Sequence, residues 1–284
     1  MGEHSEGSAA GLSFEVTGSG PTLVLVHGGS GRRQWFTTAH EHLGDSWRCV
    51  AVDLPGHGGS RWMTGAYSLD DTAAVLADAL AEVLDGPAVV FGHSHGAHVV
   101  ARVMASRPEL LRAFIIGDAP MTRTRMHEHH AQNRTMTERW MTLARSSDPD
   151  TVYDGLFATA AGPSGTSLGE MFGDRHPYLV EMAQSLAAHD PDFIDAVLNR
   201  FDDTYATLDP RDLGSHRAIP LGVLRADPDA GGLLTDADLA AITRVRPDCV
   251  VAELPNVGHG LQLQAPRDVA RALTRVGSVL AAGA

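Results

Sequence analysis

The stretch Gly92-His93-Ser94-His95-Gly96 decides the fold. It lies between an apolar run at 87–91 and a helix-like stretch at 97–106, which predicts the order strand, sharp turn, helix. In a G-x-S-x-G pattern of this kind the turn lifts the serine hydroxyl above the sheet and strains the serine backbone. Both glycines are needed because a side chain would collide where strand and helix approach. The alternative, an ordinary turn that happens to contain a serine, is disfavoured by partner motifs elsewhere in the chain.

The composition is ordinary for a globular chain of 284 residues, with 43% hydrophobic and 20% charged residues. The net charge is -13, and all 22 basic residues are arginine. Such an acidic surface disfavours nucleic acid and anionic membranes as partners. No apolar run is long enough to cross a bilayer, and the first residues lack the pattern of a secretory signal. With Cys49 and Cys249 interpreted as buried free thiols, we expect a cytoplasmic protein.

Short apolar runs alternate with longer segments in which apolar residues recur every three or four positions. Apolar strands that alternate with helices imply a mostly parallel sheet covered by helices on both faces. The expected strands are 12–16, 22–26, 48–52, 87–91, 113–117, 220–225 and 250–254. The expected helices are 68–84, 97–106, 235–245 and 266–280.

The alternation breaks between residues 121 and 217, where only helical patterns occur and methionine is frequent. Adaptable side chains of this type suit a helical cap that shapes an apolar pocket. We therefore expect a disordered arm at 1–10, a core domain formed by 11–120 and 218–284, and a cap at 121–217. In the cap, Trp140 and Met121 are candidate substrate contacts.

The cap also contains His127-Glu128-His129-His130. Neighbouring residues on a helix point in different directions, and the spacing of a histidine metal motif is missing. We expect a solvated helical face here and no metal site.

A glycine-rich loop, His27-Gly28-Gly29-Ser30-Gly31, follows the strand at 22–26. The backbone N–H of Gly29 is suited to stabilise an oxyanion together with the N–H of His95 at the helix start. A phosphate-binding loop is disfavoured because the Gly-Lys-Ser/Thr and G-x-G-x-x-G patterns are absent. The turn at 53–60 is expected to shape the rim of the site, with no catalytic part for His57.

His259 lies in a glycine-flanked loop after the last expected strand. As a general base it would take the proton of Ser94 Oγ and pass it to the leaving group. The chain has 15 histidines, so the type of residue alone is weak evidence. The order serine, acid, histidine along the chain is the stronger signal.

These motifs together resemble the α/β-hydrolase superfamily, from about residue 12 to the end of the chain. The residues that carry the resemblance are His27-Gly28-Gly29, Asp53-x-Pro-Gly-His57-Gly, Gly92-x-Ser94-x-Gly96 and Gly258-His259. The resemblance implies an α/β-hydrolase fold, a mostly parallel sheet flanked by helices, with a helical cap inserted after strand six. It also implies a cofactor-free serine hydrolase. Epoxide hydrolases and haloalkane dehalogenases carry aspartate at the position of Ser94, so their chemistry is disfavoured.

The acid that orients His259 has two candidates under this resemblance. Asp229 stands after strand seven, where most of the superfamily carries its acid. Asp118 stands after strand six, at 113–117, where some branches place it, including lactone hydrolases of the zearalenone lactonase type. We favour Asp118 because the loop at 227–234 departs from the usual pattern, which has a glycine at the position of Ala226.

The resemblance implies a small hydrophobic ester or lactone as the substrate, with a zearalenone-like lactone as its most specific form. A carbon–carbon bond hydrolase of ring-cleavage products uses a similar triad and is an alternative. A non-catalytic ligand receptor on the same fold is another. A homo-oligomer is compatible with the sequence.

Overall fold

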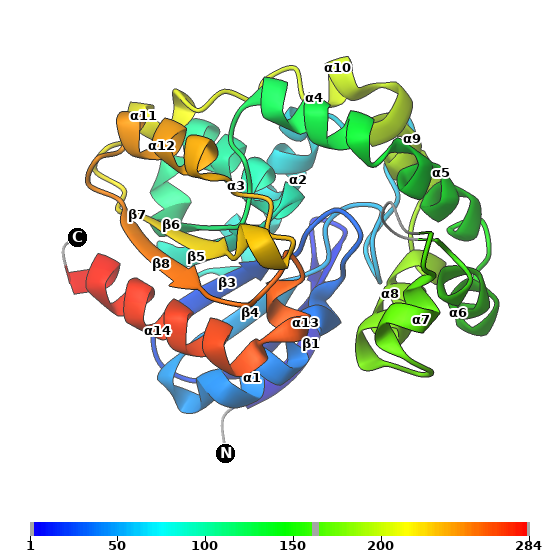
Figure 1. Ribbon diagram of the computed structural model, residues 1–284. Coiled ribbons are helices and arrows are strands. Elements are labelled where there is room, and N and C mark those ends of the chain that lie inside the picture. Colours follow the sequence, from blue (N-terminus) through cyan, green and yellow to red (C-terminus); the bar gives the residue numbers. More distant parts are fainter. Residues whose placement is uncertain (1–2, 161–164, 283–284) are drawn as a thin grey trace.

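Eight strands form one sheet in the computed structural model, which describes residues 3–160 and 165–282 (Figure 1). The strand order is β1-β2-β4-β3-β5-β6-β7-β8. All pairs from β4 to β8 are parallel, whereas β1 pairs with β2 and β2 with β4 antiparallel. The expected α/β fold with a mostly parallel sheet is confirmed. The strands are β1 Glu3–Ala9, β2 Leu12–Gly18, β3 Thr22–Val26, β4 Arg48–Val52, β5 Ala88–His93, β6 Leu111–Gly117, β7 Leu221–Ala226 and β8 Val250–Leu254.

The helices of the described residues fall into two groups, those that flank the sheet and those that follow β6. The flanking helices are α1 Thr37–Leu43, α2 Leu69–Val83, α3 His95–Ser106, α12 Asp236–Val245, α13 Leu261–Gln264 and α14 Pro266–Ala282. Between β6 and β7 lie α4 Arg123–Gln132, α5 Arg134–Leu143, α6 Pro149–Phe157, α7 Leu168–Phe172, α8 Pro177–Ala187, α9 Pro191–Asn199, α10 Phe201–Thr204 and α11 Asp212–Ser215. Short 3-10 turns occur at Arg33–Phe36, Gly44–Ser46, Pro108–Leu110 and Pro228–Ala230.

The prediction of a disordered arm at 1–10 is wrong for residues 3–9, which form edge strand β1; residues 1 and 2 lie outside the described part. A two-residue loop joins β1 to β2, and both of its residues have positive φ, 47° at Ala10 and 83° at Gly11. Such a loop matches the twist of a hairpin. This hairpin is hard to predict from sequence, because alanine is unusual at positive φ and the strand has no apolar alternation.

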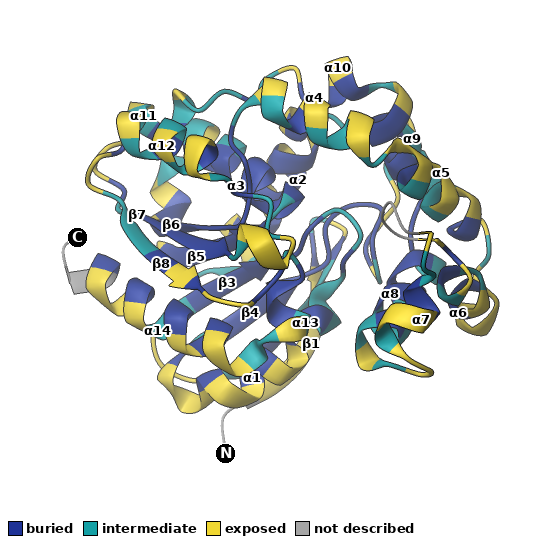
Figure 2. Cartoon of the chain, in the orientation of Figure 1, coloured by how far each residue is buried: buried dark blue, intermediate teal, exposed yellow. Residues whose placement is uncertain are grey.

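The central strands are buried on both faces, as β3 illustrates. Leu23 and Leu25 point into a core formed with α1 and α14, whereas Val24 and Val26 point into the core formed with α2 and α3. Figure 2 shows the same division, with dark strands between helices whose outer faces are exposed. This burial explains the continuous apolar runs in the sequence.

The segment between β6 and β7 contacts the core at several places, one of them the stretch at the end of α8. The segment lies beside the sheet in Figure 1. Trp35 Nε1 donates a hydrogen bond of 2.8 Å to Ser185 Oγ. The hydroxyl of Tyr67 donates one of 2.7 Å to a carboxylate oxygen of Asp190. Both bonds are buried, so they hold the second half of this segment firmly against the loops after β3 and β4.

Among the described residues, no helix has both the length and the hydrophobicity that a bilayer crossing requires.

The turn between β5 and α3 depends on close backbone packing. A Cβ on Gly92 would lie 2.7 Å from Cα of Ala97, and a Cβ on Gly96 would overlap the carbonyl oxygen of His27. Backbone atoms cannot move aside as a side chain can, so only glycine fits at these two positions.

We predict that Gly96→Ala lowers the free energy of unfolding by about 2–3 kcal/mol or more, because the added methyl group overlaps backbone. The matched control is Gly86→Ala, since a Cβ on Gly86 meets no atom within 4 Å. The control should stay within about 0.5 kcal/mol of the wild type. Urea unfolding of the three proteins measures the effect; equal stability of both variants would contradict the packing argument.

Candidate active site

The residues singled out in the sequence gather at the carboxyl ends of the parallel strands. Ser94 follows β5 and has φ 52° and ψ -123°, a strained conformation for a residue with a side chain. Its neighbour on the next strand is Asp118, because His93 pairs with Gly117 in the register of β5 and β6. The loop after β8 brings His259 to the same edge. In α/β sheets, ligands bind at this edge.

A chain of hydrogen bonds joins the three side chains. His259 Nε2 lies 3.1 Å from Ser94 Oγ, and His259 Nδ1 lies 2.8 Å from Asp118 Oδ2. The carboxylate can only accept, so Nδ1 carries the proton and Nε2 is free to accept one from the serine hydroxyl. This is the arrangement of a nucleophile, a base and an orienting acid.

Asp118 is fully buried, and its carboxylate is surrounded by donors. It accepts N–H bonds from Ala226 at 3.2 Å, Leu233 at 2.8 Å and Leu234 at 3.2 Å. Burial raises the pKa of Asp118, but the bonds from His259 and the loop N–H groups outweigh it and hold this pKa below its ordinary value. The carboxylate therefore stays ionised opposite His259.

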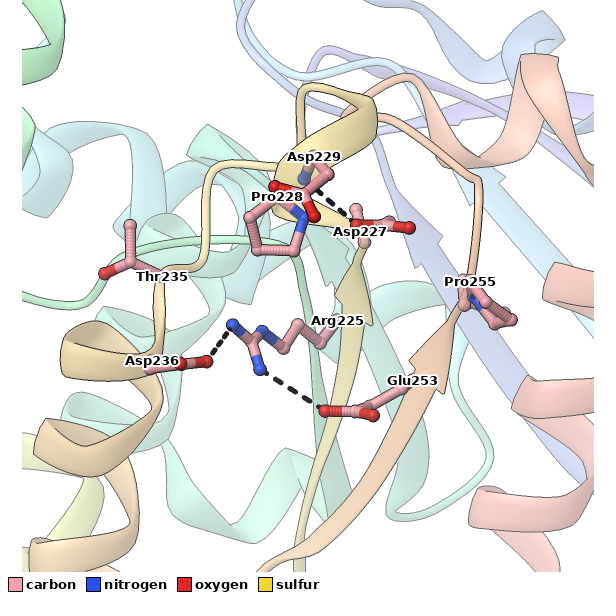
Figure 3. Close-up of a pocket in the computed structure, with 10 residues that line it drawn as sticks. Arg225, Asp227, Pro228, Asp229, Thr235, Asp236, Glu253 and Pro255 are labelled. Carbon is pink, nitrogen blue, oxygen red and sulfur yellow. Dashed lines mark hydrogen bonds and ion pairs between the residues drawn. The ribbon is translucent and has the colours of Figure 1, made fainter.

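Asp229, the alternative acid, lies elsewhere. It is exposed and lines an open pocket of about 550 Å³ beyond β7 and β8 (Figure 3). Its backbone N–H donates to Asp227, which caps the 3-10 turn at Pro228–Ala230. Figure 3 also shows Arg225 between Asp236 and Glu253. Within the described part of the chain, no hydrogen bond or ion pair joins Asp229 to His259.

The two expected oxyanion donors lie next to each other. A Cβ on Gly29 would be 3.6 Å from Cβ of His95, and a Cβ on Gly28 would be 3.1 Å from Cβ of Ser94. The N–H of His95 begins α3 and therefore has no acceptor within the helix. The carbonyl of Gly28 accepts bonds from His27 Nδ1 at 2.7 Å and from the N–H of Gly31 at 3.0 Å. These bonds fix the peptide that carries the Gly29 N–H.

Two further histidines contact the Gly29 loop: His57, expected above only in the turn that shapes the rim, and His189, which the sequence did not single out. His57 Nε2 and His189 Nε2 are each 3.0 Å from the carbonyl oxygen of Gly29, and their rings are 4.2 Å apart. His57 comes from the turn after β4, so this turn supports the Gly29 loop as well as the rim. The contact of His189 could not be foreseen, because 160 residues separate it from Gly29.

The four residues at 127–130 are only partly solvated. His127 and Glu128 are exposed, as expected, but the prediction is wrong for His129 and His130, which are half-buried. Burial lowers the pKa of His129 to about 4 and that of His130 to about 3, with His259 adding to the effect at His129. Among residues 3–160 and 165–282, no group of three or more His, Cys, Asp or Glu side chains is arranged to hold a metal ion.

Of the two candidate substrate contacts, Met121 is packed into the hydrophobic core with 2% of its surface exposed. Trp140 is half-buried on α5, and its indole N–H is buried without a partner in the described part of the structure. Trp140 therefore has an unused donor, whereas Met121 offers only apolar surface.

Comparison with known proteins adds a family and several relatives. A family model described as the alpha/beta hydrolase family matches residues 23–272. An esterase of Mycobacterium tuberculosis is 33% identical over 111 residues, which cover 39% of this chain and 37% of that esterase. The match therefore spans little more than a third of that relative. A 2-(acetamidomethylene)succinate hydrolase of Mesorhizobium japonicum is 25% identical over 93% of this chain and 90% of its own.

The solved structures agree on the fold. The structure of the M. tuberculosis esterase matches with a TM-score of 0.73 at 22% identity and covers 98% of this chain and 92% of its own. An N-acyl homoserine lactonase matches with a TM-score of 0.66 at 20% identity, over 97% of this chain and 96% of its own.

The histidines make stability sensitive to acid. Burial lowers the pKa of nine of them from the ordinary value of 6.5. These nine are His27, His40, His57, His93, His95, His98, His129, His130 and His189.

Between about pH 6.5 and about pH 4 these histidines bind protons in the unfolded chain but stay neutral in the folded one. The free energy of unfolding therefore falls as the pH is lowered. Each pKa unit is worth about 1.4 kcal/mol, so we expect a loss of several kcal/mol over this window. Urea unfolding at stepwise pH values measures it. A free energy that stays constant from about pH 7 to about pH 5 would contradict the prediction.

Proposed function

Because this chain belongs to the alpha/beta hydrolase family, we propose that it is a cofactor-free serine hydrolase that cleaves an ester or lactone bond of a small hydrophobic molecule through an acyl-enzyme. The observation that carries the proposal is the chain of hydrogen bonds from Ser94 through His259 to buried Asp118, beside two backbone donors. The M. tuberculosis esterase, to which the chain is similar in sequence and in fold, supports the reaction class.

In the proposed mechanism, Ser94 Oγ attacks the carbonyl carbon while its proton passes to His259 Nε2. The N–H groups of Gly29 and His95 stabilise the oxyanion, and one such donor is typically worth about 10²–10³ in rate. His259 then protonates the leaving alkoxide, which departs and leaves an acyl-serine. Water gives a proton to His259 and attacks the acyl carbonyl carbon; His259 then returns that proton to Ser94 Oγ as the acyl–oxygen bond breaks, and the carboxylic acid is released. Asp118 stabilises the imidazolium in both halves.

The substrate class rests on the segment between β6 and β7, which we propose is the cap. Its half-buried aromatic side chains, including Trp140 and Phe172, suit a hydrophobic molecule. A lactone is the more specific proposal, supported by the likeness of the fold to an N-acyl homoserine lactonase. The most specific form of this proposal is that the substrate is a bulky lactone of the zearalenone type.

We expect multiple turnover of p-nitrophenyl esters and a loss of about 10⁴-fold or more in kcat for Ser94→Ala. Steady-state assays with several acyl lengths and with zearalenone measure reaction and preference together. Turnover of the esters but not of zearalenone would support an esterase and reject the zearalenone-type lactone as the substrate. Absence of turnover in the wild type, with binding intact, would overturn the hydrolase in favour of a ligand receptor. Cleavage restricted to carbon–carbon bonds of ring-cleavage products would favour the alternative hydrolase.

The two aspartates give a sharper comparison. Asp118→Asn should lower kcat by about 10⁴-fold, because an amide at this position favours the wrong tautomer of His259. Asp229→Asn is the matched control and should change kcat by no more than about twofold, since the residue is exposed and has no bond to His259. The reverse ranking of these two variants would refute Asp118 as the acid.

A further inference from the structure

The loop that carries His259 is held by few bonds to the nucleophile side of the site. Both neighbours of His259 are glycines, and Asn256 earlier in the loop has a positive φ of 60°. Apart from one contact with His93, the backbone hydrogen bonds of Val257, Gly258 and His259 run to Leu254, Asp227, Gln264 and Leu261, and none of these partners lies on β5 or α3. A loop with glycine on both sides of the base needs a contact from the nucleophile side if the imidazole is to stay aligned with Ser94.

His93 provides this contact. It is the residue before the nucleophile, and its Nε2 lies 2.8 Å from the backbone carbonyl oxygen of His259. Its other ring nitrogen, Nδ1, lies 3.3 Å from the side-chain amide nitrogen of Gln262, three residues beyond His259. The two imidazole rings are 4.7 Å apart. One side chain from β5 thus contacts the loop at two places.

The contacts also fix the tautomer of His93. A carbonyl oxygen only accepts, so Nε2 must carry the proton, and Nδ1 then accepts from the amide of Gln262. The ring is 1% exposed, and burial, with His259 close by, lowers the pKa of His93 to about 3. A neutral His93 does not compete with His259 for the proton of Ser94, and both of its nitrogens are occupied.

We propose that His93 is a positioning residue that holds the backbone of His259 against the nucleophile strand, so that the base stays aligned with both Ser94 and Asp118. The inference rests on the proposed function for its effect on rate. Loss of the bond lets the loop drift, and a misplacement of about 1 Å at a reacting group can cost about 10²-fold.

The test compares His93→Phe, which keeps a ring but removes the donor, with His93→Gln, whose amide can still donate to the carbonyl of His259. We expect His93→Phe to lower kcat by about 10–100-fold with KM changed by less than about threefold. His93→Gln should recover most of that loss. His40→Phe is the control, a buried histidine on α1 that should keep kcat within about twofold.

The pH profile of kcat/KM separates positioning from a general loss of folded protein. In His93→Phe the acidic limb should move to lower pH, because the imidazolium is held less well against Asp118. A variant that is only less stable would lower the whole profile or lose activity at a higher pH on the acidic side, because stability falls with pH; it would not move the limb to lower pH. Unchanged kcat and an unmoved limb in His93→Phe would overturn the proposal, as would equal losses in the Phe and Gln variants.

Two further measurements keep the proposal testable whatever the first variants do. If His93→Phe does not fold, His93→Met removes the same donor with a flexible apolar side chain; a loss in kcat supports the proposal and wild-type kcat overturns it. If the wild type proves inactive, the proposed function is rejected, but the positioning role of His93 can still be tested. The downfield proton resonance of His259 Nδ1–H then decides: it should be lost in His93→Phe and kept in His93→Gln, and its persistence in both overturns the inference.

Discussion

The close approach of three backbone segments around Ser94 is the constraint on which the site depends. Gly96 lies so near the carbonyl oxygen of His27 that a methyl group cannot be inserted, and Gly28 lies against Ser94 itself. This packing holds Ser94 at φ 52° and sets the Gly29 loop beside the start of α3. A strained backbone conformation persists only where the surrounding packing prevents it from relaxing. Here backbone packed on two sides of Ser94 prevents this.

The sequence predicts what depends on local pattern, and most of the sheet falls in this class. Apolar runs such as that of β3 are found because burial on both faces leaves no alternation, and the G-x-S-x-G turn because sterics allow little else there. Strand β1 is missed because an exposed edge strand carries no apolar signal. The contacts of His189 with Gly29 and of His93 with His259 are missed for another reason, since they join residues 160 and 166 apart in sequence.

The abundance of histidine around Ser94 has a physical rationale in donor geometry. A neutral imidazole presents one donor and one acceptor at fixed positions, and burial keeps it neutral at the pH where a serine hydrolase works. His27 and His93 both have this pattern. Each ring accepts an N–H hydrogen bond at one nitrogen, so its own proton is on the other nitrogen. That N–H donates a hydrogen bond to a backbone carbonyl of the site. Charged donors would disturb the proton affinity of His259, and neutral ones do not.

The position of Asp118, whose carboxylate bonds to His259, follows from the backbone of the neighbouring strand and loop. Asp118 follows β6, the strand next to β5, so the register of the two strands places its backbone beside that of Ser94. The loop after β7, where the superfamily more often carries its acid, here caps its own 3-10 turn with Asp227 and turns the N–H groups of Leu233 and Leu234 toward Asp118. The loop after β7 therefore donates hydrogen bonds to Asp118, the carboxylate bonded to His259, and in the described part of the chain its own Asp229 has no bond to His259.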